Sequence, residues 1–537
     1  MPGRKGSTLG TRLDWNFTTV PQPGLGGRAV GANRGKVLGG SSALNLLCWD
    51  RAAAAEYDAW AEAGNPGWDW KAMRAAMLRS ENFTGGPPGS GTAGPVRAVV
   101  NRRVPDHQAA WIPTLRDGFG IPENGDSLNG NPIGVSIQPS SIDPRHYNRS
   151  YSANAYLPLA GRNLEVLTDT LVAKVLLRNS TKGGRQIATG VLLANGTVVS
   201  ARREVILSAG AFQSPLLLEL SGVGQPALLA SANITTVIPL PGVGENLADH
   251  VRVQASYLLP EGATSFDILR YNASFAAEQL ARWIAGDPSW YDYTASGFLF
   301  ASWPQALGPD RAARLHALAR AELAGSRHPA DRAALRHLAD PRVPQLEVIF
   351  SDGYTGPRGY PPVGAPLRGR NFFTLIAGLM HPLARGSVHL DPAAPHAARP
   401  VINPRYGASE HDLAALAEAA AFLRRLAAAP PLRGVWEAEF EPGLETVPAG
   451  AGDEVWQNHA RNNTLSIFHP TGTCSMLPRA DGGVVDARLL VYGTDNLRVV
   501  DASVVPVQVS AHIQTAVYGI AERAAEIIVR EAAGAGC

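Results

Sequence analysis

Two histidines near the end of the chain are the residues best suited to acid–base chemistry. His469 lies in the segment Phe468-His469-Pro470-Thr471-Gly472-Thr473-Cys474-Ser475-Met476, and His512 follows after Asp501-Ala502-Ser503. Imidazole has an unperturbed pKa near neutrality, so it can take up and return a proton at working pH. Two imidazoles at one substrate oxygen can act as a base and hold the hydroxyl. The chain has 13 histidines, so the assignment of this pair to acid–base chemistry depends on the residues around it.

A glycine-rich stretch within the first fifty residues is suited to contact with a ligand. It reads Asn33-Arg34-Gly35-Lys36-Val37-Leu38-Gly39-Gly40-Ser41-Ser42-Ala43-Leu44-Asn45. Paired glycines let the backbone approach a ligand closely, and the amides and hydroxyls of the serines that follow can face the same ligand. A tight turn that caps a helix would use the same residues, so the spacing alone leaves both interpretations open.

A second glycine-containing stretch predicts a strand followed by a helix. It runs from Val205-Ile206-Leu207 to Gly224. Pro215 suits the first turn of a helix, and Gly222 and Gly224 suit its C-terminal exit. This unit must also pack as a strand and helix, whatever it binds.

A G-x-G-x-x-G pattern at residues 89–94 is a poor candidate for a phosphate site. In dinucleotide-binding folds a strand precedes this turn and a helix follows it, so that backbone amides and the helix dipole meet the pyrophosphate. Here the pattern follows Gly85-Gly86-Pro87-Pro88 and precedes Pro95 and an extended Val99-Val100. We therefore predict a plain surface loop.

Together, the two glycine stretches resemble the two signature motifs of the glucose–methanol–choline (GMC) oxidoreductase family, the first of them continuing to Asp58. Residues 241–250 are similar to the loop that ends the family's N-terminal region. Residues 386–390 with 402–406 are similar to the start of its C-terminal region. The histidine segments match the family's arrangement of His-Pro-x-Gly-Thr-x-x-Met, Asp-Ala-Ser and His. The resemblance covers nearly the whole chain.

The resemblance implies a bound FAD and a role for each matching residue. His469 would be the general base, and His512 would be its partner, which hydrogen-bonds the alcohol and touches the flavin. A flavin can accept, at N5, the hydride that leaves the alcohol carbon. Phe468 would contact the substrate, and Cys48 would lie near the flavin. The positions that would contact FAD are Gly39, Gly40, Ser41, Asn45, Leu46, Trp49, Val172, Asp501, Ala502, Ile513 and Gln514.

Within this set, the family resemblance divides the C-terminal residues between parts of the cofactor. Asp501 and Ala502 would contact the ribityl and diphosphate region, and Ile513 and Gln514 would lie near the isoalloxazine ring. Val172 is where family members place a backbone contact to adenine. Asp501 also has a purely structural interpretation, as the cap of a turn that follows a strand.

The residues around the base favour an aromatic or other apolar primary alcohol. The phenylalanine at position 468, directly before the base, resembles the residue that aryl-alcohol oxidases have there, whereas glucose oxidases have a tyrosine at that position. Glucose-oxidising relatives carry an arginine four positions before the base, where this chain has Leu465. An apolar side chain cannot satisfy the hydroxyls of a sugar. The expected reaction is therefore alcohol to aldehyde, with dioxygen or a quinone as electron acceptor.

The family's opening strand, G-x-G-x-x-G turn, helix and acidic residue have no counterpart in this sequence. The chain begins where relatives have Asp-Trp-x-Phe/Tyr-x-Thr, matched by residues 14–19, so roughly one βαβ unit of about 30 or more residues is absent. Three alternatives stay open: normal FAD binding in a longer protein, weak binding through the remaining contacts, and a flavin-free, inactive fold. Two other function classes also stay open. One is a lyase or cyclase that keeps the flavin without redox chemistry, and the other is a non-catalytic binding scaffold.

The elements that must position these residues alternate between strands and helices. Short apolar runs rich in β-branched residues predict strands, and apolar residues at helical spacing predict helices. The predicted strands are 164–167, 172–177, 187–193, 205–207 and 497–500, with a further sheet within 343–390, and the predicted helices start near 56 and lie within 310–340, 409–428 and 514–530.

The family resemblance implies an α/β fold with two interleaved domains. One is a FAD-binding domain with a partly parallel sheet, and the other is a substrate domain with a large antiparallel sheet and flanking helices. Residues 1–250 would form the truncated N-terminal part of the FAD-binding domain. Residues 251–454 would form mainly the substrate domain, and 455–537 would return to the FAD-binding domain with both histidines.

Charge and hydropathy exclude some partners. With 48 basic and 46 acidic side chains the net charge is +2, so no global basic field attracts nucleic acid or anionic lipid. No apolar run reaches the ~20 residues that a membrane helix needs. We therefore expect neither nucleic acid nor a membrane as a partner.

The compartment is indicated by asparagine sequons and not by cysteines. Three cysteines cannot build a disulfide framework. N-linked glycans attach to Asn-x-Ser/Thr sequons on surface loops of secreted proteins. We therefore expect a secreted, extracellular glycoprotein whose signal peptide is not in this chain, with chance sequons in a cytosolic protein as the alternative. The eight sequons are at Asn16, Asn82, Asn148, Asn179, Asn195, Asn233, Asn272 and Asn462.

Overall fold

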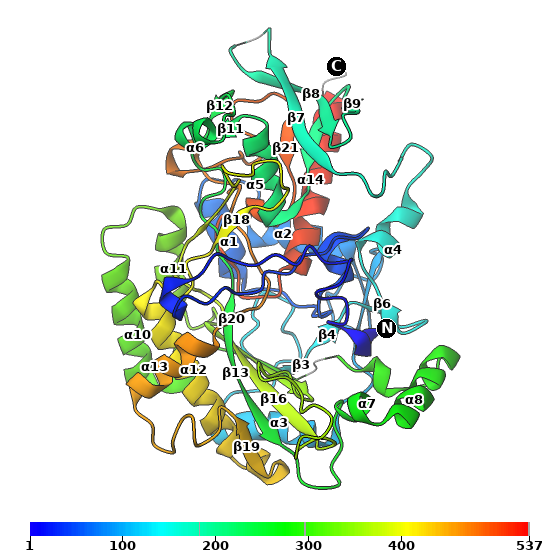
Figure 1. Cartoon of the computed structure of the whole chain (residues 1–537), viewed down its shortest axis with the longest axis vertical. Coiled ribbons are helices and arrows are strands. Elements are labelled where there is room, and N and C mark those ends of the chain that lie inside the picture. Colours follow the sequence, from blue (N-terminus) through cyan, green and yellow to red (C-terminus); the bar gives the residue numbers. More distant parts are fainter. Residues whose placement is uncertain (182, 295–296, 535–537) are drawn as a thin grey trace.

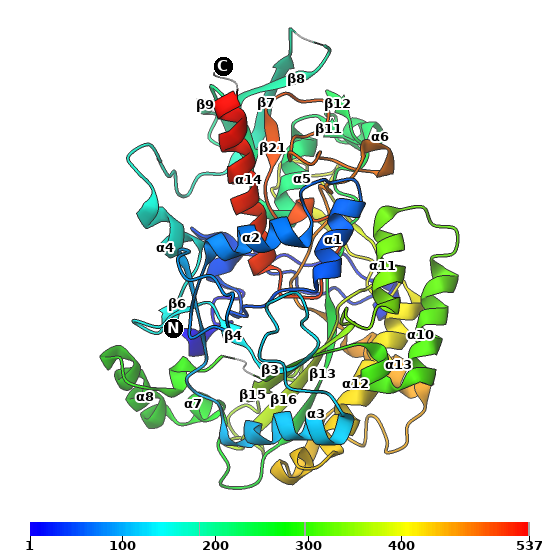
Figure 2. The same cartoon turned by 180° about the vertical axis from the view of Figure 1, so that it is seen from behind.

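The computed structural model describes residues 1–181, 183–294 and 297–534. It has two packed regions that meet in the middle of the molecule (Figure 1). The lower region in that view is built on a large sheet, and the upper one contains smaller sheets and the C-terminal helix α14 (Gln514–Gly534). Helix α2 (Trp70–Ser80) packs against α14, so a segment from the first hundred residues and the C-terminal helix share one region (Figure 2).

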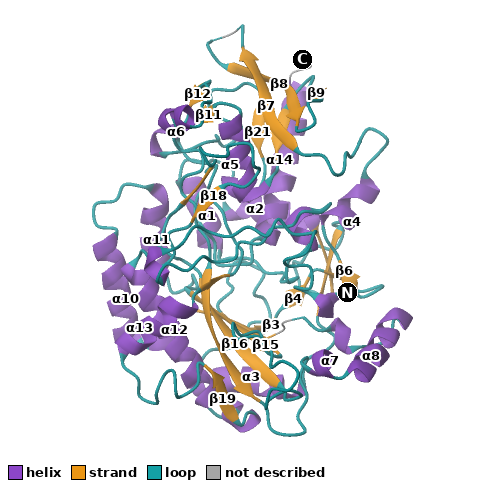
Figure 3. Ribbon diagram, viewed as in Figure 1, coloured by secondary structure: helices purple, strands orange, loops and turns teal. Residues whose placement is uncertain are grey.

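Within the described residues, the large sheet has seven strands, and all neighbours in it are antiparallel (Figure 3). The order is β19-β13-β16-β15-β14-β3, and β20 also pairs with β13. This is the large antiparallel sheet that the family resemblance implies. Its strands are β3 (Gly134–Ile137), β13 (Val251–Leu258), β14 (Gly297–Ala301), β15 (Leu346–Asp352), β16 (Phe372–Leu379), β19 (Ala438–Glu441) and β20 (Leu465–Ser466).

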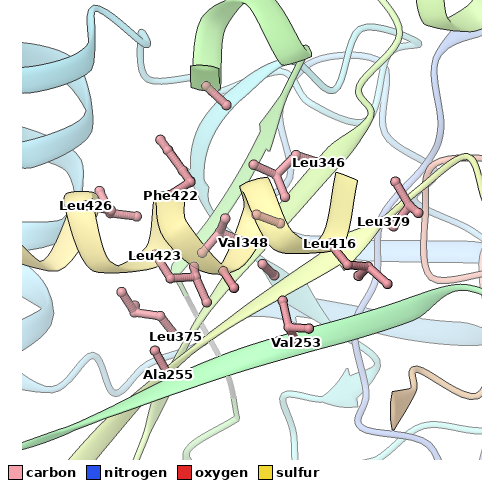
Figure 4. Close-up of a cluster of buried hydrophobic side chains, with 14 of the residues drawn as sticks. Val253, Ala255, Leu346, Val348, Leu375, Leu379, Leu416, Phe422, Leu423 and Leu426 are labelled. Carbon is pink, nitrogen blue, oxygen red and sulfur yellow. The ribbon is translucent and has the colours of Figure 1, made fainter. Parts of the chain in front are cut away.

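Helix α12 (Glu410–Ala428) covers one face of this sheet (Figure 4). The side chain of Ser409 accepts a hydrogen bond from the N–H of Asp412 and caps the helix. Two acidic residues in the first turn suit the positive end of the helix dipole. Because side chains alternate along a strand, the opposite face is free to carry polar groups. Figure 4 labels the core residues Val253, Ala255, Leu346, Val348, Leu375, Leu379, Leu416, Phe422, Leu423 and Leu426.

The upper region has smaller sheets around a second apolar core. One pair of strands, β10 (Val205–Leu207) and β21 (Leu497–Val499), is parallel, as the resemblance implies for the FAD-binding domain. An antiparallel meander of β7 (Val172–Asn179), β8 (Gln186–Leu193) and β9 (Val198–Ser200) lies beside it. Helices α1 (Ala54–Glu62) and α5 (Gly210–Leu220) complete the packing.

The remaining helices and strands are distributed over the two regions (Figure 1). The helices are α3 (Trp111–Phe119), α4 (Ser152–Tyr156), α6 (Pro226–Ser231), α7 (Ile268–Tyr271), α8 (Ala273–Ala285), α9 (Trp303–Leu307), α10 (Pro309–Glu322), α11 (Pro329–Ala339) and α13 (Asp453–Asn463). The strands are β1 (Glu81–Thr84), β2 (Val96–Val100), β4 (Pro139–Ser140), β5 (Ile142–Asp143), β6 (Asn148–Arg149), β11 (Val223–Gly224), β12 (Ile238–Pro239), β17 (Ser387–His389) and β18 (Val401–Asn403).

The strand predicted at residues 164–167 does not form. The segment lies in irregular structure, and Leu164, Val166 and Leu167 are 51%, 44% and 56% exposed. A strand needs a neighbour to satisfy its backbone and cover its side chains. No strand among the described residues pairs with this segment, so its apolar pattern cannot become a sheet.

The prediction that Pro215 lies in the first turn of a helix was wrong. Helix α5 begins at Gly210, which places Pro215 inside it. Proline lacks an N–H, so the carbonyl of Ala211 loses its usual partner one turn later. The hydroxyl of Thr473 donates to that carbonyl at 2.6 Å. The segment that carries His469 therefore repairs the defect in the helix.

The G-x-G-x-x-G pattern at residues 89–94 lies in the loop between β1 and β2, as predicted. A strand follows it and not a helix, so no helix N-terminus faces it. Cys48 and Cys474 are buried free thiols, and Cys537 lies outside the described residues.

Across the part of the chain that the structure describes, no helix combines the length and apolar character needed to span a bilayer.

We predict that Thr473→Val destabilises the fold by about 1–3 kcal/mol, because the buried Ala211 carbonyl is then left without its partner. Urea unfolding at fixed temperature measures the change. Thr168→Val, at an exposed position, is the matched control and should leave the midpoint unchanged. Equal stability of Thr473→Val and the unmodified chain would refute the helix-repair role of this hydroxyl.

Candidate active site

A buried carboxylate holds the backbone of His469 in place. Asp249 accepts from the N–H of His469 at 2.7 Å through Oδ1. Its Oδ2 accepts from the hydroxyls of Ser466, at 2.6 Å, and of Tyr406. Phe468, next to the base, has a φ of 67°, in the left-handed region. Such a conformation costs of order 1–3 kcal/mol in a non-glycine residue, so these hydrogen bonds fix a turn that would otherwise relax.

The ring of His469 is oriented by a second histidine. Nδ1 of His469 lies 2.9 Å from Nδ1 of His250, and both rings are buried. A hydrogen bond between two such nitrogens contains one hydrogen, so one ring donates and the other accepts. When His469 donates from Nδ1, its Nε2 carries the free lone pair that a base requires.

Burial keeps His469 uncharged. Burial first, then the charges of His512, His250 and Arg34, lower the pKa of His469 well below its ordinary value. Burial also lowers the pKa of His250 to about 3. His469 is therefore neutral at neutral pH, which is the state in which it can accept a proton.

His512 has the opposite environment. Its backbone N–H and its Nδ1 both bind the carboxylate of Asp50, at 2.9 Å and 2.7 Å, and Oε1 of Glu347 lies 3.4 Å from Nδ1. Burial opposes a charge on His512, but Cys48, Glu347 and Asp50 outweigh it and raise the pKa of His512 well above its ordinary value. His512 is therefore an imidazolium.

Glu347 is unusual because it is buried without hydrogen bonds. It is 1% exposed, and neither carboxylate oxygen has a hydrogen-bond partner among the described residues. Burial raises its pKa to about 7, against the opposing charge of His512. The carboxylate therefore gains or loses its charge near neutral pH, directly beside the imidazolium.

The two predicted catalytic histidines thus face each other. Their ring centroids are 4.9 Å apart, with the rings nearly perpendicular at 84°. One ring is a neutral base and the other a cationic donor. A hydroxyl within reach of both rings can lose its proton to His469 while His512 stabilises the negative charge that develops on its oxygen.

The N-terminal glycine motif lies beside this pair. Gly39 precedes a short 3₁₀ turn formed by residues 40–43. The side-chain amide of Asn45 donates to Oε1 of Gln514 at 2.8 Å, and Gln514 donates to the carbonyl of Cys48. The two motifs that the sequence separates by most of the chain are therefore in direct contact.

The other residues expected near FAD fall into different surroundings. Trp49 is fully buried and donates to Glu81 at 2.6 Å. The carboxylate of Asp501 is already engaged by Gly210, Ser214 and Ser503. The capping role weighed for Asp501 is thus present in the structure. Among the remaining three, Val172 starts β7, Ala502 begins a short 3₁₀ turn and Ile513 is half-buried.

The turn at Gly39 and Gly40 is open on the side of Gly40 and is covered by the ring of Tyr151 on the side of Gly39. Gly39 and Gly40 have φ values of 93° and 55°, and a Cβ at Gly40 would meet no atom within 4 Å. Leu38 and Leu46 are both 46% exposed. Exposed apolar side chains around a turn with open space are typical of a ligand site. Ser41 is also exposed there. This side of the turn is therefore accessible to a ligand.

Sequence reasoning missed the groups that set the protonation of the two histidines. Asp249 and His250 end the motif at residues 241–250, which was predicted only as a loop, so a signal for them was present. Asp50 follows Trp49 in the first motif. Glu347 lies in a run predicted only as a strand, and nothing in the sequence distinguishes it from a solvent-facing residue.

Comparison with known proteins identifies the family of the chain. Models of the GMC oxidoreductase family match residues 4–252 and 382–521. The GMC oxidoreductase family protein Mala s 12 of Malassezia sympodialis is 36% identical over 548 residues, covering 97% of this chain and 84% of that protein.

Two solved structures share the fold over nearly the whole chain. An FAD-dependent oxidoreductase from Chaetomium thermophilum has a TM-score of 0.85 at 27% identity, covering 97% of this chain and 90% of that one. A fungal aryl-alcohol oxidase has a TM-score of 0.81 at 28% identity, with the same coverages. With its sequence motifs, its fold and these matches in agreement, the chain belongs to the GMC oxidoreductase family and is an oxidoreductase.

Proposed function

We propose that this protein oxidises a primary alcohol to its aldehyde with FAD, and with dioxygen or a quinone as electron acceptor. The observation that carries the proposal is the contact between a neutral His469 and a cationic His512. Loss of a hydroxyl proton needs a base and a stabilised oxyanion at one place. FAD, when bound, supplies the hydride acceptor.

Each step on the protein side has a residue to perform it. Nε2 of His469 accepts the hydroxyl proton, and the Nδ1 contact to His250 keeps that nitrogen facing the substrate. His512, whose Nδ1 is engaged by Asp50, presents its other ring edge to the oxygen. Gly39, Gly40, Asn45 and Gln514 would hold the flavin beside the pair.

Apolar side chains around the histidines favour an aromatic substrate. The ring centroids of Phe298 and His512 are 5.8 Å apart, and the two rings meet edge-on. It belongs to a cluster from β14, β15 and their neighbours, where an aromatic ring would be covered by other apolar groups. The half-buried Phe468 adds a further aromatic wall. The buried members of the cluster are Cys48, Phe298, Phe300, Ile349 and Met380.

The guanidinium of Arg252 places a charge beside the apolar Leu465. In the β13–β20 pairing Arg252 lies directly opposite Leu465, so their side chains share a face of the sheet. Burial lowers the pKa of Arg252 to about 10, and no carboxylate contributes to the shift. A substrate with an acceptor group far from its hydroxyl, such as a ring carboxylate or carbonyl, would complement this guanidinium.

We also propose secretion and N-glycosylation. None of the eight sequon asparagines is buried, and five of them are exposed: Asn16, Asn179, Asn195, Asn233 and Asn462. Expressed with a signal peptide in a eukaryotic host, the chain should exceed its 56.7 kDa and lose mass on treatment with peptide N-glycosidase F. A secreted product at the unmodified mass would contradict the proposal.

The decisive test begins with a flavin spectrum of the purified chain before and after adding FAD. We expect the FAD-loaded protein to oxidise veratryl or cinnamyl alcohol and to leave glucose unchanged. His469→Ala should keep the flavin spectrum and lower kcat by about 10²–10⁴-fold, the usual contribution of a general base.

Each contrary outcome rejects a different part of the proposal. Turnover of glucose but not of aromatic alcohols refutes the substrate class. Product formation without consumption of dioxygen or a dye acceptor indicates a lyase or cyclase. A chain that takes up no FAD, or a His469→Ala variant with full activity, refutes the catalytic role.

The charge balance at His512 predicts a shift in the pH profile. Asp50→Asn removes a negative charge that faces the imidazolium, so the pKa of His512 falls and the alkaline limb of kcat/KM moves to lower pH. Glu347→Gln removes charge but keeps the 2.7 Å hydrogen bond from His512 to Asp50. It should move the limb in the same direction with a smaller loss of kcat. An unchanged alkaline limb in both variants would contradict the assignment of His512 as the cation.

A further inference from the structure

A second cluster of ionisable side chains lies away from the pair His469 and His512. Glu56 from α1, His337 from the last turn of α11, and His381 from the segment after β16 come together in the interior. They are 0%, 3% and 3% exposed. One possible ligand atom from each lies within 4.8 Å of the other two. Three residues far apart in the sequence therefore converge at one buried point.

The carboxylate of this cluster is firmly oriented. Oε1 of Glu56 accepts from the N–H of Ser510 at 2.6 Å, and Oε2 accepts from Ala53 at 2.7 Å and from the Ser510 hydroxyl at 2.5 Å. Nε2 of His381 lies 3.1 Å from Oε1. Hydrogen bonds that fix a carboxylate in this way are typical of metal ligands.

His337 lacks an equivalent set of partners. Neither ring nitrogen forms a hydrogen bond of good geometry with a described residue, although the carbonyl of Ala55 lies close by. A buried polar group left unpaired destabilises the fold. The ring centroids of His337 and His381 are 5.1 Å apart.

We propose that Glu56, His337 and His381 bind a divalent transition-metal ion such as Zn²⁺. Neutral imidazole and carboxylate are the ligands that this class of ion prefers, whereas Mg²⁺ and Ca²⁺ prefer all-oxygen sites. Bonds of about 2.1 Å to a tetrahedral ion place ligand atoms about 3.4 Å apart. The widest pair here must close by at most ~1.4 Å, which side-chain rotations provide, and water completes the coordination.

The ion would join segments that lie far apart in the sequence. Glu56 holds Ser510, two residues before His512, and α11 packs against α1 through Ala330 and Ala333. The metal would therefore fasten α1, whose Glu56 holds the loop that carries His512, to α11 and to the segment after β16. Its role is structural, because none of its ligands contacts the two catalytic rings.

Metal uptake tests the proposal without flavin or turnover. The purified full chain is treated with EDTA, dialysed, incubated with ZnCl₂ and analysed for bound zinc by mass spectrometry. We expect about one equivalent per chain and a higher midpoint of thermal unfolding with zinc than with EDTA. His337→Ala and His381→Ala should each weaken zinc binding at least ~100-fold and abolish the thermal shift. His396→Ala, at an exposed histidine, is the matched control and should keep both.

The opposite results overturn the proposal whatever the enzyme's activity. No zinc uptake by the folded, EDTA-treated chain would mean that the cluster is only a network of imidazole and carboxylate groups. Uptake that survives in both histidine variants would place the metal elsewhere. If a variant fails to fold, His337→Gln replaces it, since its amide keeps the polarity and most of the volume of the ring.

Discussion

The proposed catalytic centre depends on keeping two adjoining imidazole rings in different protonation states. Rings with centroids 4.9 Å apart would titrate alike in equal surroundings. Here the surroundings differ. Asp50 and Glu347 lie beside His512, whereas burial, His250 and the guanidinium of Arg34 lower the pKa of His469. The large sheet supports this difference. Its α12-facing side is apolar, and the alternation of side chains leaves positions such as Glu347 on the other side.

Much of the fold could be predicted from periodicity. Helices within 310–340, 409–428 and 514–530, and strands such as 187–193, form where the patterns indicated, because each buries one face against a core. The failure at 164–167 has a different cause. A strand requires a partner that its own pattern does not reveal, and the apolar run has none among the described residues. The prediction for Pro215 failed because the distant hydroxyl of Thr473, and not the local sequence, supplies the hydrogen bond that the helix lacks at this proline.

The site was predictable to the extent that motifs carry it. His469 and His512 were identified from their segments, and the contact between Asn45 and Gln514 joins residues that both belonged to predicted cofactor motifs. The groups that tune the base and its partner were not found. His250 reaches His469 only after β13 and β20 pair, and Glu347 reaches His512 across the sheet. Pairings of this kind are properties of the assembled fold, and no spacing in the chain encodes them.

The hydroxyl of Thr473 on the carbonyl of Ala211 links catalytic competence to cooperativity of unfolding. A helix with a missing backbone hydrogen bond is prone to open at that turn, and local openings of this kind set which parts of a protein unfold together. Because the missing bond is supplied by the segment that carries His469, opening of α5 and release of that segment become one event. The molecule would then lose its base whenever this helix melts, and a partly unfolded form that retains activity would not accumulate.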